Sequence, residues 1–175
     1  LGLDLDASSK VADEAGQGQI CTTANDNANG QVVISGAKAA VERAMLIAKD
    51  NGAKRAVLLP VSAPFHCALM APAADIMAEA LSSIRMNAPV VPLIANVTAS
   101  EVIDAAEIRR LLVEQVTGMV RWREGVLFMR DNGVDQLVEI GTGKALSGLA
   151  RRIDRDMTAQ SIGIPEDVET FLKSL

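Results

Sequence analysis

The 175-residue sequence predicts an α/β fold in two parts, a small ferredoxin-like subdomain over residues 1–60 and a larger region over residues 61–175. Two observations predict this division. The first part alternates signals in the order strand, helix, strand, strand, helix, strand, which is the order of a ferredoxin-like unit. In the second part helices are interleaved with apolar strands, which is typical of a largely parallel sheet covered on both faces.

The elements of the N-terminal part are marked by periodicity and by turn residues. GLDLD at residues 2–6 has the alternation of a short strand. NDNANG at residues 25–30 is predicted to be the turn between the two middle strands. Asn51 and Gly52 end the second helix. The remaining predicted elements are a helix over 8–14, strands over 19–26 and 31–36, a helix over 37–50 and a strand over 55–62.

The C-terminal part begins with apolar residues at helical spacing over 69–86, where Pro72 is tolerated because it lies in the first turn. VVPLIANV at residues 90–97 predicts a buried strand. Asp104 and Glu107 resemble a capping box for the next helix. A second buried strand, VDQLVEI at residues 134–140, leads into the glycine turn GTGK and another helix. So few strands cannot form a self-sufficient sheet, so we expect the chain to begin inside a fold.

Composition argues against several classes of protein. A formal net charge of −5, with 2% aromatic residues and no tyrosine, disfavours a nucleic-acid partner. The sequence contains no run of apolar residues long enough to span a membrane, and LGLDLDASSK lacks the order of a signal peptide. Cys21 and Cys67 lie far apart in unrelated contexts, so we expect free thiols in the cytoplasm and no metal site.

Several motifs that suggest chemistry do not match in detail. GTGK at residues 141–144 lacks the earlier glycine and the following Ser or Thr of a phosphate-binding loop, so a tight strand-to-helix turn explains it better. The sequence contains no G-x-S-x-G nucleophile elbow, and Ser35 and Ser147 lack its flanking glycines. We interpret Cys67, which directly follows the only histidine, as a packing residue.

His66 is that only histidine, and it lies between Pro64 and the apolar helix of residues 69–86. A lone histidine is more often structural than catalytic. Here, however, the positive end of the helix dipole disfavours the charged imidazolium, and a neutral imidazole can accept a proton. The local sequence therefore favours a general base held on a short loop.

Four ordered motifs resemble a known family. They are PVSAPFHCALMAPAAD, NAPVVPLIANV, LLVEQVTGMVRW and VDQLVEIGTGKALSGLARR, and GQVVISGAKAAVERA adds to them. Their content, order and spacing are similar to the C-terminal portion of malonyl-CoA:acyl carrier protein transacylase from bacterial type II fatty-acid synthesis. The resemblance covers essentially the whole chain. It implies a partial α/β-hydrolase-like core over residues 61–175 with the ferredoxin-like subdomain inserted in it.

The resemblance also implies a reaction and roles for residues. A serine takes malonyl from malonyl-CoA and passes it to the phosphopantetheine thiol of acyl carrier protein, with no further cofactor and no metal. His66 matches the catalytic general base, and Gln115 matches the position whose main-chain carbonyl orients it. Asn96 matches an asparagine near the site. Phe65, before the histidine, matches the residue that goes with malonyl rather than methylmalonyl in related acyltransferase domains.

The sequence departs from the family pattern in ways that limit activity. The elbow serine and the arginine that pairs with the malonyl carboxylate are absent, so the chain alone is expected to be inactive. Thr142 replaces a usual proline, which is a mild change. Two alternatives remain, an acyltransferase module of a polyketide synthase and a noncatalytic truncated binding module. Basic residues between Arg121 and Arg155 form either a solvated surface or a docking patch for the acidic carrier protein.

Overall fold

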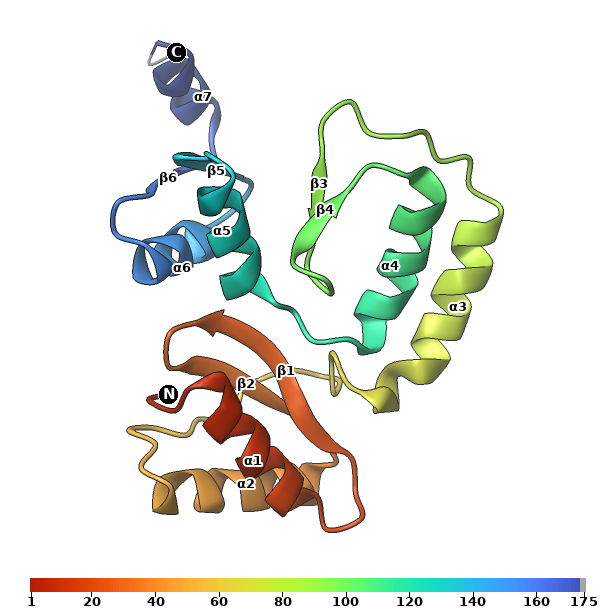
Figure 1. Cartoon of the computed structure of the whole chain (residues 1–175), viewed down its shortest axis with the longest axis vertical. Coiled ribbons are helices and arrows are strands. Elements are labelled where there is room, and N and C mark those ends of the chain that lie inside the picture. The colour runs from red at the N-terminus through yellow and green to blue at the C-terminus, as the bar shows by residue number, and fades with distance from the viewer. Residues whose placement is uncertain (174–175) are drawn as a thin grey trace. The chain divides into compact units, whose positions relative to one another are not determined.

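The computed structural model describes residues 1–173, and the chain divides into two compact units, Leu1–Gly125 and Val126–Leu175 (Figure 1). The predicted subdomain of residues 1–60 lies wholly inside the first unit, so this division does not test its boundary. Among residues 1–173, no helix has the length and apolar content needed to cross a membrane.

The N-terminal part of the first unit is a hairpin packed against two helices (Figure 1). The strands β1 (Cys21–Ala28) and β2 (Gln31–Gly36) pair antiparallel through the tight connection Asn29–Gly30, where Gly30 has a φ of 69°. The predicted turn is therefore shorter than NDNANG, and β1 continues through its first four residues. The helices are α1 (Leu5–Gly16) and α2 (Lys38–Asp50), which share a core of Val11, Ala15, Ala44 and Ala48.

Two strands predicted for this part are not formed. In GLDLD, Asp4 is instead the N-cap of α1, and its Oδ1 accepts a 2.8 Å hydrogen bond from the Ala7 amide. Residues 55–62 pair only once, where Leu1 and Arg55 exchange backbone hydrogen bonds of 2.8 and 3.3 Å. The apolar side chains of this segment remain exposed because no described strand lies beside it. The ferredoxin-like description needs both flanking strands and stays a prediction.

The middle of the chain consists of two helices and a short hairpin. The helix predicted over 69–86 is a 3-10 turn, η1 (Ala68–Met70), followed by α3 (Ala71–Ser82), with Pro72 in the first turn as predicted. The hairpin strands are β3 (Leu93–Ala95) and β4 (Ser100–Val102), and the second helix is α4 (Ala105–Thr117). The buried strand predicted at residues 90–97 forms only in part, since β3 is short and pairs antiparallel, Ala95 is buried, and Val90 is fully exposed.

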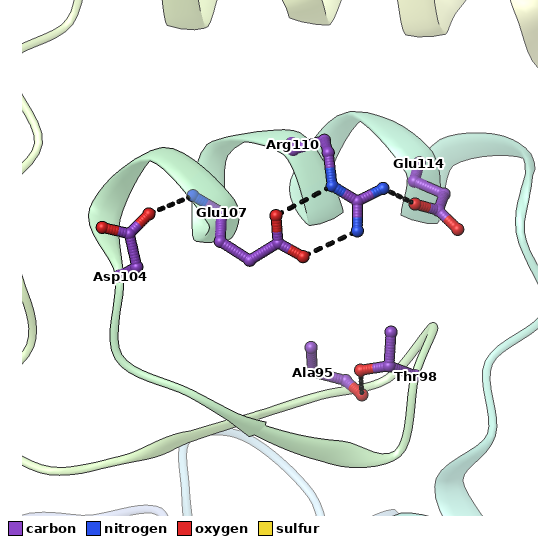
Figure 2. Close-up of polar contacts among 6 residues, drawn as sticks. All are labelled: Ala95, Thr98, Asp104, Glu107, Arg110 and Glu114. Carbon is purple, nitrogen blue, oxygen red and sulfur yellow. Dashed lines mark hydrogen bonds and ion pairs between the residues drawn. The ribbon is translucent and has the colours of Figure 1, made fainter.

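The start of α4 carries half of the predicted capping box. Asp104 Oδ1 accepts a 2.8 Å hydrogen bond from the Glu107 amide (Figure 2). The Glu107 carboxylate does not return to the Asp104 backbone but binds Arg110, which also reaches Glu114 (Figure 2). The hydrogen bond from Arg110 lowers the pKa of Glu107 below its ordinary value. These exposed pairs support α4 only modestly, so the Asp104 cap is the stronger local signal.

The second unit contains one strand-helix-strand repeat. The helix α5 (Trp122–Asp131) leads into it, and β5 (Gln136–Ile140) pairs parallel with β6 (Thr158–Ile162) across α6 (Ala145–Ile153). The helix α7 (Pro165–Leu172) follows β6. Among the named strands of residues 1–173, only this pair is parallel. The expected largely parallel sheet is therefore confined to β5 and β6, and β5 is not buried, since Ile140 is 83% exposed.

Candidate active site

His66 lies on the loop before η1, in the first unit, and its backbone has an unusual conformation. Its φ is 59°, in the left-handed region that few residues other than glycine occupy. Histidine is one of the side chains that occur there more often than average. Such a conformation persists only where the surrounding structure holds it, and it is frequent at functional sites. The half-buried His66 is therefore held in place rather than free to rotate with the loop.

The loop around His66 is closed by short-range contacts. The Phe65 amide donates a 3.0 Å hydrogen bond to the Ala63 carbonyl. The Cys67 thiol donates to the Pro64 carbonyl at 3.2 Å. Cys67 is 1% exposed, so its interpretation as a packed residue is confirmed, although its thiol also makes this polar contact.

The imidazole of His66 contacts the end of α4. Its Nδ1 lies 3.0 Å from the carbonyl oxygen of Gln115. Gln115 lies in the last turn of α4, where carbonyls lack a partner within the helix. Because a carbonyl can only accept, Nδ1 carries the proton in this contact, and Nε2 of the neutral ring is left as the acceptor. The structure thus brings together the two residues that the resemblance pairs.

The contact with the C-terminal end of α4 is the one that the resemblance implies for Gln115. The local sequence around His66 indicates only the N-terminal end of the helix that follows it. The Gln115 carbonyl at this helix end therefore orients the imidazole ring. The Gln115 side chain also takes part in this helix end, because its Nε2 donates to the Gly118 carbonyl at 2.9 Å.

Phe65 and His66 line one cavity of the first unit. It has a volume of about 990 Å³ and extends along β2, α2 and the exposed segment of residues 55–65. Phe65 is 45% exposed beside it. The cavity is walled mainly by apolar side chains, several of which belong to the segment 55–62 that has no neighbouring strand among the described residues.

Asn96 does not join this group directly. It lies in the turn between β3 and β4, and its side chain is exposed. Its backbone carbonyl accepts a 2.9 Å hydrogen bond from the Arg121 amide. Within residues 1–173, no hydrogen bond joins the Asn96 side chain to His66. The structure therefore gives Asn96 a structural contact, and its role near the site stays a prediction.

The segment that leaves α4 is tied to β1, a link that sequence reasoning missed. Val120 donates to the Ala24 carbonyl at 2.9 Å, and its own carbonyl accepts from the Asp26 amide at 2.9 Å. Arg123 Nε donates to Asp26 Oδ2 at 2.8 Å, although Asp26 is only 1% exposed. Burial raises the pKa of Asp26 by more than Arg123 lowers it. No sequence signal predicted this pair, because Asp26 was assigned to a turn.

The start of α6, which follows the glycine turn at residues 141–144, binds the carboxylate of Glu139 from the preceding strand β5. Glu139 accepts hydrogen bonds from the Ser147 hydroxyl at 2.7 Å and from the Ser147 and Leu146 amides at 2.8 and 3.1 Å. These hydrogen bonds lower the pKa of Glu139 below its ordinary value, and the bond from the Ser147 hydroxyl has the largest effect. The amides at the start of α6, which a phosphate would need, are thus already paired with Glu139.

The basic residues between Arg121 and Arg155 differ in their availability. Three of them form ion pairs inside the chain: Arg121 with Glu124, Arg123 with Asp26, and Arg130 with Asp131 and Asp154. Lys144 and Arg155 are exposed and form no ion pair within the described part of the chain. Whether these two cations of the second unit dock a partner stays a prediction.

Comparison with known proteins extends this description. No family model matches the sequence. A malonyl CoA-acyl carrier protein transacylase of Salmonella typhimurium is 47% identical over 172 residues, which are 98% of this chain and 56% of that protein. The chain spans about half the length of the curated relatives that it matches.

Solved structures give the same result. An acyl-carrier-protein-S-malonyltransferase of Bartonella henselae matches with a TM-score of 0.95 and 50% identity, over 99% of this chain and 55% of that one. A malonyl-transacylase in complex with a holo type II polyketide synthase acyl-carrier protein matches with a TM-score of 0.96 and 43% identity, over 100% of this chain and 57% of that one. The predicted resemblance is therefore confirmed. The chain is homologous over its whole length to part of these transacylases, consistent with a C-terminal portion.

Proposed function

We propose that the chain supplies the general base for transfer of malonyl from coenzyme A to the phosphopantetheine thiol of acyl carrier protein. The observation that carries this proposal is the contact of His66 Nδ1 with the Gln115 carbonyl at 3.0 Å in a chain homologous to malonyl transacylases. In the neutral ring, that contact leaves Nε2 as the nitrogen that can accept a proton, as a general base requires.

The proposed reaction has two half-reactions. A serine hydroxyl gives its proton to His66 Nε2 while its oxygen attacks the thioester carbonyl of malonyl-CoA, and the coenzyme A thiol leaves with the proton returned by the imidazolium. The malonyl group is then held as a seryl ester. In the second half, Nε2 takes the proton of the phosphopantetheine thiol, whose sulfur attacks the ester carbonyl. The serine oxygen leaves with the proton that the imidazolium returns, so the serine and the neutral imidazole are restored. The sequence lacks an elbow serine, so another segment must supply it.

Phe65 is proposed to set the preference for malonyl. Phe65 lines the same cavity as His66, and the bulk of its ring is proposed to limit space for a branched acyl chain. Discrimination by one methyl group is worth only about 1–3 kcal/mol, so the preference is graded rather than absolute. Asn96 is proposed to lie near the bound substrate, by resemblance alone.

The fold, the cofactor requirement and the cellular compartment are proposed as follows. Residues 61–175 are proposed to be the C-terminal part of an α/β-hydrolase-like core, into which residues 1–60 insert as a ferredoxin-like subdomain. Serine, imidazole and thioester suffice for the chemistry, so no cofactor or metal is needed beyond the carrier's own phosphopantetheine. The two free cysteines fit a cytoplasmic protein.

An acidic carrier protein is the proposed partner, and Lys144 and Arg155 are its proposed contacts in the second unit. Charge reversal at Arg121 or Arg123 is a poor test, because these side chains pair with Glu124 and Asp26. Lys144→Glu and Arg155→Glu are expected to weaken carrier binding, whereas Lys10→Glu on α1 is the control. Unchanged affinity in both variants would remove these residues from the docking surface.

Labelled malonyl-CoA tests the reaction. The isolated 175-residue chain is expected to take up no covalent label, and stable labelling of it would contradict a nucleophile outside the chain. A longer polypeptide that includes the elbow serine is expected to form a labelled ester, and His66→Ala should slow its formation by about 10³-fold or more. Carrier proteins of fatty-acid and polyketide synthesis should both be tested as acceptors, since one similar structure is a complex with a polyketide carrier. Labelling that does not depend on His66 would overturn the proposal.

A further inference from the structure

We propose that Cys67 is a positioning residue whose thiol holds His66 in its left-handed conformation. This inference rests on the proposed function of His66 as a base, but it concerns how the imidazole is held. The role goes beyond the packing that burial alone would suggest for this cysteine.

The thiol closes the backbone around His66. Cys67 Sγ lies 3.2 Å from the Pro64 carbonyl oxygen, so the contact spans Phe65 and His66. Cys67 itself is anchored on its other side, because its carbonyl accepts a 2.9 Å hydrogen bond from the Met70 amide in η1. The residue is 1% exposed, so water does not compete for this thiol contact. A thiol is a weak donor, but this one is buried, and both the side chain and the backbone carbonyl of Cys67 are hydrogen-bonded.

The conformation of His66 needs such a contact. A φ of 59° is unfavourable for a side chain with a Cβ atom and persists only when neighbouring groups hold it. Two side-chain hydrogen bonds act on this turn. One joins the imidazole Nδ1 to the Gln115 carbonyl, and the other joins the Cys67 thiol to the Pro64 carbonyl across the residue. Without the second bond, His66 can relax toward an extended backbone, which moves Nδ1 away from Gln115.

Substitution can separate the hydrogen bond from packing. Cys67→Ser keeps a donor at the same position but is smaller. Cys67→Val fills the space and suits the extended backbone of Cys67, whose φ is −143° and ψ is 170°, but it has no donor. A positioning role predicts that the serine variant resembles the parent and the valine variant does not. A purely packing role predicts the opposite order. Cys21→Val is the matched control, because Cys21 is the other free cysteine and is half-buried.

The state of His66 can be read directly in the 175-residue chain, because it contains a single histidine. Long-range proton–nitrogen NMR correlations distinguish a protonated Nδ1 from a protonated Nε2. The parent, Cys67→Ser and Cys21→Val are expected to show Nδ1 protonated in the neutral ring. Cys67→Val is expected to shift toward the Nε2-protonated form that free histidine prefers.

A parent-like tautomer in a folded Cys67→Val overturns the proposal whatever Cys67→Ser shows, because the thiol donor is then not needed. If the valine variant gives no dispersed amide spectrum, the serine variant still decides, because loss of the Nδ1-protonated form there contradicts the donor role. In a polypeptide with transacylase activity, Cys67→Val should lower kcat by about 10- to 100-fold with KM unchanged, and Cys67→Ser should restore it. The tautomer does not depend on catalysis, so failure of the proposed function leaves the NMR result interpretable.

Discussion

Arg123 Nε donates a 2.8 Å hydrogen bond to Asp26 Oδ2, which joins residues 97 positions apart in the sequence. Asp26 lies on β1 and is 1% exposed, whereas the Arg123 side chain at the start of α5 is 26% exposed. The two partners are therefore unequal. Arg123 can reach water if it loses its partner, but Asp26 cannot.

This asymmetry predicts different costs for removing each partner. Arg123→Met leaves an unpaired buried carboxylate and should lower the free energy of unfolding by about 3 kcal/mol. Asp26→Asn keeps an acceptor for Arg123 and leaves only its amide hydrogens unsatisfied, which should cost about 1 kcal/mol. Denaturant unfolding measures both, with the exposed Arg85→Met as control. Equal costs would contradict a buried charge held by Arg123.

The raised pKa of Asp26 also predicts a pH dependence. A group whose pKa is raised by folding stabilises the folded state below its unfolded pKa, and this contribution is lost as pH rises through the folded pKa. The parent should therefore lose stability relative to Asp26→Asn as pH rises from the ordinary aspartate range to above the raised pKa. Unfolding free energies over this range check the sign. A difference that grows in the opposite direction would show that Arg123 outweighs burial.

Glu139 predicts the opposite pH dependence for the second unit. Its pKa is lowered by the hydrogen bonds from Ser147 and Leu146. The stabilisation is present above the ordinary glutamate pKa and is lost as pH falls through the lowered value. Hydrogen exchange of the α6 amides should be slower in the parent than in Glu139→Gln near pH 7, and this difference should vanish in acid. Glu169→Gln on α7 is the control. A difference in exchange rate that persists in acid would show that the ionised Glu139 carboxylate does not stabilise the start of α6.

The Asp104 cap should matter measurably for α4. Asp104→Ala removes the acceptor of the Glu107 amide and should lower the free energy of unfolding by about 1 kcal/mol. Asp104→Asn keeps an acceptor and should cost less. Thermal and denaturant unfolding distinguish the two, and similar losses in both variants would mean that charge rather than the hydrogen bond stabilises this end.

Phe65 predicts a change in acyl selectivity. In a polypeptide with transacylase activity, Phe65→Ser should raise kcat/KM for methylmalonyl-CoA relative to malonyl-CoA by about 10-fold, because it opens space beside His66. Phe65→Leu, which keeps bulk, should change this ratio less. Competition between the two thioesters measures the ratio directly, and no change in Phe65→Ser would exclude ring bulk as its cause.

Local signals predicted much of the fold. The strand β2 and the helix α2 lie where periodicity predicted them, at residues 31–36 and 38–50. Asp104 caps α4, as the sequence predicted. The prediction of a strand at residues 55–62 was wrong because an apolar, strand-like composition cannot by itself supply the neighbouring strand that pairing needs. The prediction of a strand at GLDLD was wrong because the Asp4 side chain caps α1, and this local hydrogen bond competes with extended pairing.

The site was predicted only in part. The contact between His66 and Gln115 was expected from the family resemblance, not from spacing, because 49 positions separate them. The left-handed backbone of His66 has no sequence signature, since histidine occupies that region only when its surroundings require it. The link between Val120 and β1 is equally nonlocal, and no periodicity marks it.

That link has a mechanical consequence. Because both polar groups of Val120 are engaged with β1, the hairpin cannot slide or tilt without either rupturing this junction or dragging the end of α4 with it. The imidazole is attached to that same helix end through Gln115. We therefore expect a displacement of β1, for example by engineered cross-links on β1 and β2, to change the position of the imidazole through Val120, the end of α4 and Gln115.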